Sequence, residues 1–279
     1  MRIHDFNTQG NSVDIEYVDG EHFRVARAEI RDEHTSPREQ AIYFPEDAGV
    51  ITVETMDFFW RTAAPAVVLH SLGASVKITA DGNNEDVYTL EKIALKAHQI
   101  PDERVESPPG IFMDKREGVA LYTRENRFFI AGGQRRESGW YVHSLKGHPH
   151  GTDNVFGVSD ARWEAGVRDG EVVHYHRNSL EPLVVLEGTA VLLVEVDGRH
   201  YSFKQERGVL TVPDKMQVHG ILTVEASPRG VYRHMCVQAP SMFHDASDRV
   251  VVPGQGYESG KTKDYVTAHG IPTVLLGEK

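Results

Sequence analysis

The chain has 279 residues, of which 40% are hydrophobic and 25% are charged, as in a globular protein of one large or two ordinary domains. Its 30 basic and 41 acidic residues give a net charge of −11, which argues against nucleic acid or an anionic membrane as the main partner. The single cysteine, Cys236, excludes an intrachain disulfide and fits a reducing compartment. Because no segment has the pattern of a signal peptide or a membrane span, we expect a cytoplasmic protein.

Short strand-like segments dominate the chain. They are rich in β-branched and aromatic residues, and turn residues separate them. They cover residues 41–44, 49–55, 65–70, 75–80, 119–123, 127–132, 183–196, 209–213, 220–226 and 231–239. Helical patterns are scarce: residues 89–101 form the best candidate for a helix, and 159–170 fit one short turn. This pattern predicts an all-β sandwich or barrel.

A weak internal repeat predicts two tandem domains. PAVVLHSLGASVKITADG (65–82) resembles PLVVLEGTAVLLVEVDG (182–198), although any two β-hairpins that end in Asp-Gly look alike. We therefore divide the chain into a β-rich N-terminal domain at 1–146, a second domain at 147–250 and a C-terminal tail at 251–279. The apolar end of the tail predicts docking on a barrel or on a partner subunit.

The stretch HYHRNSLE (174–181) has a pattern that suits metal binding. His174 and His176 project from the same face of a strand, and a short turn can bring Glu181 back towards them. A third imidazole should come from another strand, where His219 in GVLTVPDKMQVHGI is the best candidate. Three histidines and one carboxylate suit a divalent transition metal: iron, manganese, nickel, cobalt, copper or zinc. The alternative is a polar edge strand with incidental histidines.

These two segments resemble the metal-binding motifs of the cupin superfamily. HYHRNSLEPLVVLEG has the form HxH, four residues, E, six residues, G, which is the spacing of the first cupin motif. GVLTVPDKMQVHGI resembles the second motif, although its stretch from Pro213 to His219 is one residue longer and lacks a glycine. The resemblance implies a double-stranded β-helix, or jelly-roll, barrel with a metal inside one mouth. It covers about residues 155–245.

The resemblance also implies a bicupin with one metal site. Aligning the repeats puts the positions equivalent to the HxH motif near residues 57–59, where no histidine pair stands. The N-terminal domain would then be a degenerate, metal-free cupin.

The strand at 231–238 follows the second motif and has two different faces. Tyr232, His234 and Cys236 lie on one face, and Arg233 lies on the other. If the first face lines the pocket, His234 is a candidate acid–base residue with Tyr232 beside it; if the second does, Arg233 can clamp an anionic substrate. The sequence does not decide between them. We interpret Cys236 as a small buried packing residue.

Gln217 lies two residues before His219 and shares its face on a regular strand. It is a further catalytic candidate that would bind the substrate or the ligand carboxylate, and a solvent-facing glutamine is the alternative.

The ligand set leaves one or two metal positions open for a substrate, O₂ or water. We expect an enzyme that acts on a small polar, oxygen-rich molecule, with an Fe(II)-type dioxygenase favoured. A metal-dependent isomerase or epimerase of a sugar acid or keto compound is the first alternative, and a non-catalytic ligand-binding cupin is the second. We also expect a homodimer.

Overall fold

A computed structural model describes most of the two β-rich regions. It covers residues 1–16, 22–28, 30, 34–35, 40–56, 59–70, 75–92, 98–99, 112–114, 119–123, 128–130, 136–143, 153–164, 173–239, 248–252 and 273–275. The one helical element in these ranges is the 3-10 turn η1 (Glu46–Ala48). The predicted all-β class is therefore confirmed.

The chain forms two compact units. The C-terminal unit consists of Met1–Gln9, Phe129–Ser138 and Ser159–Lys279, and the N-terminal unit of Gly10–Phe128 and Gly139–Val158. The sequence-based boundary lay at 146. In the structure the first residues also belong to the C-terminal unit, because β1 (Arg2–Asp5) pairs with β21 (Val209–Val212). The chain passes from one unit to the other within β16 (Asp153–Glu164).

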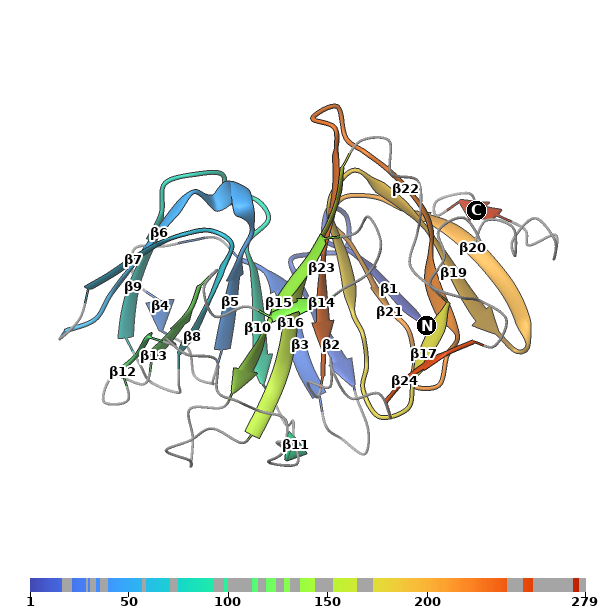
Figure 1. The fold of residues 1–279 in the computed structure, drawn as a ribbon, viewed down its shortest axis with the longest axis horizontal. Coiled ribbons are helices and arrows are strands. Elements are labelled where there is room, and N and C mark those ends of the chain that lie inside the picture. The colour runs from blue at the N-terminus through green and yellow to red at the C-terminus, as the bar shows by residue number, and fades with distance from the viewer. Residues whose placement is uncertain are drawn as a thin grey trace. The chain divides into compact units, whose positions relative to one another are not determined.

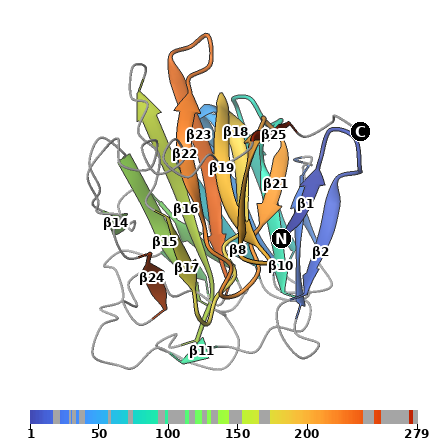
Figure 2. The ribbon, with the colours of Figure 1, turned by 90° about the vertical axis from the view of Figure 1, so that its right-hand side faces the viewer.

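Two sheets, antiparallel except for the β20–β25 pair, build the C-terminal unit (Figure 1). The first has the order β1-β21-β18-β23-β16, with β18 at Leu183–Glu187 and β23 at Val231–Gln238 (Figure 2). The second has the order β24-β17-β22-β19-β20-β25. Its strands are β24 (Arg249–Val251), β17 (His174–His176), β22 (His219–Glu225), β19 (Thr189–Val196), β20 (Arg199–Gln205) and β25 (Thr273–Leu275). Alternate residues of both sheets, such as Val185 and Leu192, meet in one apolar core.

The N-terminal unit also has two sheets. The larger has the order β12-β13-β8-β5-β10-β3-β2, and the smaller β4-β9-β6-β7. The larger comprises β12 (Phe112–Asp114), β13 (Val119–Tyr122), β8 (Ala66–His70), β5 (Gln40–Phe44), β10 (Tyr88–Lys92), β3 (His22–Arg27) and β2 (Ser12–Glu16). The smaller comprises β4 (His34–Thr35), β9 (Ser75–Ala80), β6 (Val50–Glu54) and β7 (Phe59–Ala63). The remaining described strands belong to the sheet that contains β16: it continues from β16 to β15 (Arg136–His143) and β14 (Phe128–Ile130), and β11 (His98–Gln99) also pairs with β16.

The two units repeat the same strand order. In the C-terminal unit β18 lies between β21 and β23, and β22 lies between β17 and β19. In the N-terminal unit β5 lies between β8 and β10, and β9 lies between β4 and β6. Strands β4 to β10 therefore correspond to β17 to β23, as two tandem barrels require.

This correspondence corrects the repeat alignment made from sequence. Residues 65–82 contain β8 and β9, which correspond to β21 and β22 and not to the hairpin at 182–198. The alignment was wrong because every hairpin of this fold has similar alternating apolar residues. The counterpart of the HxH strand is accordingly β4. Of residues 57–59, where we placed it, 57 and 58 lie outside the described ranges and Phe59 begins β7.

Both predicted helical segments are strands where they are described. Residues 88–92 form β10, in which Tyr88 and Leu90 are buried on one face and Thr89 and Glu91 on the other. Residues 159–164 belong to β16, whose Ala161 and Trp163 join the C-terminal core. A two-residue alternation explains both segments better than the helical period does.

The C-terminal tail contributes one strand to the C-terminal unit. Strand β25 pairs in parallel with β20, with Val274 opposite Phe203. The tail thus adds a strand to the second barrel. Within the described residues, no helix is long and apolar enough to cross a membrane.

Candidate metal centre

Strand pairing brings three predicted ligands together. His174 lies directly opposite His219 in the β17–β22 ladder, so both side chains project from the same face of the sheet. His176 follows two residues later on that face, and all three histidines are buried. Below them on the same face, Leu192 and Ile221 belong to the apolar core. The three imidazoles therefore lie at one end of the barrel interior.

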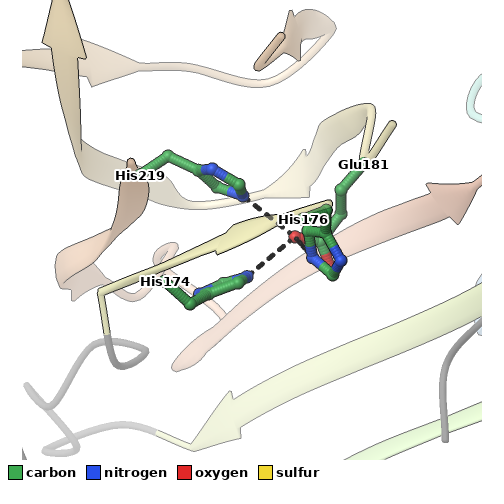
Figure 3. A group of neighbouring side chains, drawn as sticks. All are labelled: His174, His176, Glu181 and His219. Carbon is green, nitrogen blue, oxygen red and sulfur yellow. Dashed lines mark hydrogen bonds and ion pairs between the residues drawn. The ribbon is translucent and has the colours of Figure 1, made fainter. Parts of the chain in front are cut away.

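Glu181 completes the group from the short segment just before β18, a strand of the opposite sheet (Figure 3). Its Oε2 atom lies 3.0 Å from Nε2 of His174, 3.0 Å from Nε2 of His176 and 3.1 Å from Nε2 of His219. A β-bridge between Leu180 and Ala239 fixes the chain just before this glutamate. The structure thus gathers the four residues that the sequence nominated as ligands.

The donor spacing fits a single transition metal ion. Two ligands at right angles, each about 2.1 Å from an ion, lie about 3.0 Å apart. The three Nε2–Oε2 distances match this value, and the four donor atoms all lie within 4.8 Å of one another. The donors are also of the kind, three imidazole nitrogens and one carboxylate oxygen, that such ions prefer.

Gly188 closes the first motif for a steric reason. It has a positive φ of 76° in the turn between β18 and β19. A Cβ at this position would lie 2.5 Å from the carbonyl oxygen of Glu225 in β22, so any other residue would push the turn away from β22.

A second set of hydrogen bonds orients two of the histidines. His176 Nδ1 lies 2.8 Å from Oδ2 of Asp248, and His219 Nδ1 donates to the carbonyl oxygen of Gln217 at 2.7 Å. With the Nδ1 proton directed to these acceptors, Nε2 of each ring is left to face Glu181. The ring tautomers are therefore those that a metal at Nε2 needs.

Asp248 is a functional residue that the sequence reasoning missed. Its carboxylate is fully buried and accepts hydrogen bonds from the backbone N–H groups of Asn178 and Ser179 and from the Ser179 hydroxyl. It therefore holds both His176 and the turn that leads to Glu181. No spacing rule indicates a residue that acts across 72 positions of sequence.

The predicted catalytic role of Gln217 does not fit its contacts. Its Nε2 donates to the carbonyl oxygen of Glu195, and its Oε1 accepts from the backbone N–H of Asp214. Both ends of the amide thus stabilise the loop before His219. In the same loop Met216 has a positive φ of 60°, so this residue stands where the left-handed backbone of the turn favours glycine.

The structure decides which face of β23 looks into the barrel. The Cys236 thiol donates to Oε1 of Glu181 at 3.3 Å, and Nε2 of Gln238 lies 3.4 Å from Nδ1 of His176. Further along this face, the Tyr232 hydroxyl lies 3.2 Å from Nδ1 of His234. Trp163 packs against both rings, at centroid distances of 5.2 Å and 5.3 Å. Cys236 is therefore more than a packing residue.

The structure does not place Arg233 where the predicted anion clamp would need it. Arg233 is on the opposite face of β23, where its Nη2 lies 2.7 Å from Oδ2 of Asp160 in a buried ion pair. Strand alternation excludes it from the face that carries Cys236 and His234.

Burial and charge shift the pKa values of the ligands in opposite directions. Burial lowers the pKa of His174 to about 4, and the positive charge of Arg249 adds to this effect. Burial also opposes protonation of His176, but the charges and hydrogen bonds of Glu181 and Asp248 outweigh it and raise the pKa of His176 to about 9. Burial likewise disfavours a charged Glu181, yet its pKa is held well below the usual range by His176 and the other histidines.

The fold is similar to that of solved oxalate decarboxylases. One such enzyme has a TM-score of 0.58 and 10% identity, over 90% of this chain and 79% of the other. The Lactobacillus farciminis enzyme, solved as a formate complex, has a TM-score of 0.57 and 9% identity, over 90% and 88% of the two chains. A variant of the Bacillus subtilis enzyme gives 0.57 and 10%. No protein-family model and no curated protein matches the sequence.

The chain has the cupin fold. The implied jelly roll is confirmed, with the first cupin motif on β17 and the turn after it and the second on the loop before β22. At this level of identity the likeness concerns the fold, so the chemistry must be argued from the residues of the site.

Proposed function

We propose that this cupin is a metal-dependent enzyme that acts on a small polar, oxygen-rich molecule, as an Fe(II)-type dioxygenase. The observation that carries the proposal is the convergence of His174, His176, His219 and Glu181 at the spacing of cis ligands. Four protein ligands leave two positions of an octahedral ion for other molecules. When bound, Fe²⁺ would supply a redox-active Lewis acid with room for substrate and O₂.

The surrounding residues prepare the site for this chemistry. Asp248 and the carbonyl oxygen of Gln217 fix the imidazole tautomers, and Cys236 holds the second oxygen of Glu181 away from the histidines. The apolar core on the inner side excludes water from the barrel end. His234 and Tyr232, hydrogen-bonded to each other on the inward face, are the groups available to hold or move a proton on a bound substrate.

A manganese-dependent reaction on a carboxylic acid is the second candidate. Its support is the likeness to oxalate decarboxylases, one of which is described as having Mn(II) centres. An isomerase would use the same ligands, with His234 as the proton-transferring group. Both alternatives differ from the first in needing no net oxidation of the substrate.

We further propose that the N-terminal barrel does not hold a metal. Val76 lies opposite His34 in the β4–β9 ladder, as His219 lies opposite His174. Gln40 is the counterpart of Glu181. It lies opposite His70, six residues before Val76. In the C-terminal barrel, extending the β18–β21 register places Glu181 opposite Pro213, six residues before His219. A valine and an amide thus stand where the C-terminal barrel has a histidine and a carboxylate.

One set of measurements tests these proposals. The purified protein is loaded in turn with Fe²⁺, Mn²⁺, Ni²⁺ and Zn²⁺, and bound metal per chain and oxygen uptake with candidate diketones, catechols and hydroxy acids are recorded. One ion per chain and uptake that needs iron and substrate together would support the dioxygenase. Turnover with manganese and no uptake would favour the second candidate, and two ions per chain would contradict a metal-free N-terminal barrel.

A further inference from the structure

Met216 is an exposed methionine in an unfavourable backbone conformation beside the candidate metal centre. Its φ is 60°, which glycine adopts freely and which is costly for a residue with a long side chain. Packing does not offset this cost, because 56% of the residue is exposed. Neither the backbone nor the core of the folded chain therefore explains a methionine at this position.

The loop that carries Met216 runs along the solvent-facing side of the metal centre. It begins at Pro213, which the extended β18–β21 register places opposite Glu181, and it leads to His219. These two ligands are the ones that solvent reaches most, with 14% and 8% of their side chains exposed, against 3% or less for the other two histidines. Met216 thus lies on the side from which another molecule would approach the metal.

Hydrogen bonds hold this loop in place. The Met216 N–H donates to the carbonyl oxygen of His176 at 2.8 Å, and the Gln217 N–H donates to the carbonyl oxygen of Asp214 at 3.0 Å. The side-chain amide of Gln217 adds one bond within the loop and one to the carbonyl oxygen of Glu195 in β19. A fixed turn therefore presents the methionine to solvent.

Val196 adds a second exposed apolar side chain at the same end of the barrel. It is 39% exposed, and Met216 and Val196 are the two exposed large hydrophobic residues in the described part of the C-terminal unit. Val194 lies opposite His219 in the β19–β22 ladder, so extending this register places Val196 opposite Gln217, next to Met216. Because Val194 belongs to the interior core, Val196 projects from the same inward face. We call Met216 and Val196 the apolar rim.

We propose that the apolar rim is a specificity determinant that binds an alkyl or aryl group of a substrate whose oxygen atoms bind the metal. The exposed methionine contributes apolar burial only when another molecule covers it, and its flexible thioether chain adapts to apolar surfaces of irregular shape. The inference rests on the metal site of the proposed function. It narrows the substrate to a molecule with a polar, metal-binding head and an apolar substituent.

The test uses the full chain loaded with Co²⁺, whose visible absorption changes when a ligand enters an open position. Acetohydroxamate and hexanohydroxamate are the probes, since both present the same two oxygens to the metal and differ only in the length of the alkyl chain. The affinity ratio of the longer to the shorter probe is measured in the wild type and in Met216→Gly, Met216→Leu, Val196→Thr and Met56→Gly. Met56 lies in the N-terminal unit and is 91% exposed, so Met56→Gly is the matched control.

The ratio should be at least about tenfold in the wild type, because each fully buried methylene group adds about fourfold in affinity. Met216→Gly should lower the ratio by at least about threefold. Its acetohydroxamate affinity and cobalt content should stay within about twofold of the wild type, since glycine suits the positive φ. Met216→Leu should restore most of the ratio, Val196→Thr should lower it by at least about twofold, and Met56→Gly should leave it unchanged.

A wild-type ratio below about tenfold, or a smaller drop in Met216→Gly than about threefold, would overturn the proposal. An equal drop in the Met56→Gly control would overturn it as well. A changed oligomeric state of Met216→Gly in light scattering, with an unchanged ratio, would assign the rim to a second copy of the chain instead. Should Met216→Gly fail to hold cobalt, Val196→Thr decides, and a drop of less than about twofold there would overturn the proposal.

This design separates two kinds of failure. If the wild type develops no cobalt spectrum, the metal site fails and the proposed function fails with it. If the spectrum develops and the ratio does not depend on the apolar rim, only the assignment of an apolar substituent is lost.

Discussion

Asp248 and His176 are 72 residues apart in sequence, yet Oδ2 of the one lies 2.8 Å from Nδ1 of the other inside the barrel. The same Oδ2 accepts from the Ser179 hydroxyl, and Oδ1 accepts from two backbone N–H groups. All these partners are donors, so only a group with two acceptor oxygens satisfies them. This relationship makes Asp248 the best single probe of how the site is held.

Asp248→Asn should weaken metal binding by about 10- to 100-fold while the barrel still folds. The amide has one acceptor oxygen, so either His176 or the backbone of 178–179 must face an N–H group. Metal affinity is measured by competition with a chelator. Ser179→Ala is the matched control, because it removes one partner of the same carboxylate and leaves His176 untouched. A loss in the control as large as that in Asp248→Asn would show that Asp248 acts on the turn and not on the ring.

His174→Ala and His176→Ala should each abolish tight metal binding and turnover. Each variant removes one of four ligands from a buried site, whereas the apolar core that supports the barrel is left intact. Metal content by elemental analysis and circular dichroism of the strands give the two readouts. Glu181→Gln should weaken binding less, because three imidazoles remain. Turnover that survived in both histidine variants would disprove the site assignment.

Metal binding should be coupled to the release of about one proton at pH 7. His176, with its pKa raised to about 9, is protonated in the metal-free protein, and this proton must leave before Nε2 can bind an ion. His174, with its pKa lowered to about 4, is already neutral. Apparent affinity should rise about tenfold per pH unit towards pH 9 and level off above it. Calorimetry in two buffers of different ionisation enthalpy measures the proton count, and zero protons would contradict the prediction.

The metal-free protein should lose stability as the pH rises from about 6.5 to 9. The folded state raises the pKa of His176 above its unfolded value, so the stabilisation from its charge is complete below pH 6.5 and disappears above 9. Denaturant titrations of metal-free protein at several pH values measure this change in the free energy of unfolding. His176→Gln should remove the dependence in that window, and an unchanged profile would argue against a protonated His176.

Cys236→Ser and Cys236→Ala should differ in metal affinity. The thiol donates to Oε1 of Glu181, and a serine hydroxyl can replace it whereas a methyl group cannot. We expect alanine to weaken binding by about threefold to tenfold and serine to stay near the wild type. Both residues are small, so the comparison separates the hydrogen bond from packing. Equal affinities would return Cys236 to the packing role that the sequence indicated.

The sequence by itself determined the class of fold and the four candidate ligands. Alternating apolar residues and frequent turns exclude a helical protein, because each strand buries one side of a period of two. The spacing of His174 and His176 puts both side chains on one face before any partner strand is known, and the short segment after them can turn to bring Glu181 back. His219 was found from its strand pattern and the motif around it.

Only the tertiary structure decided what surrounds those ligands. The phase of a strand relative to the barrel interior depends on its neighbours, so Arg233 and His234 could not be told apart until β23 was seen beside β18. Arg249 begins the edge strand β24 and Asp248 directly precedes it, and the partner of this strand, β17, is more than 70 residues away in sequence. The local sequence pattern determines which residues of a strand share a face. Only the pairing of distant strands determines which side chains each face contacts.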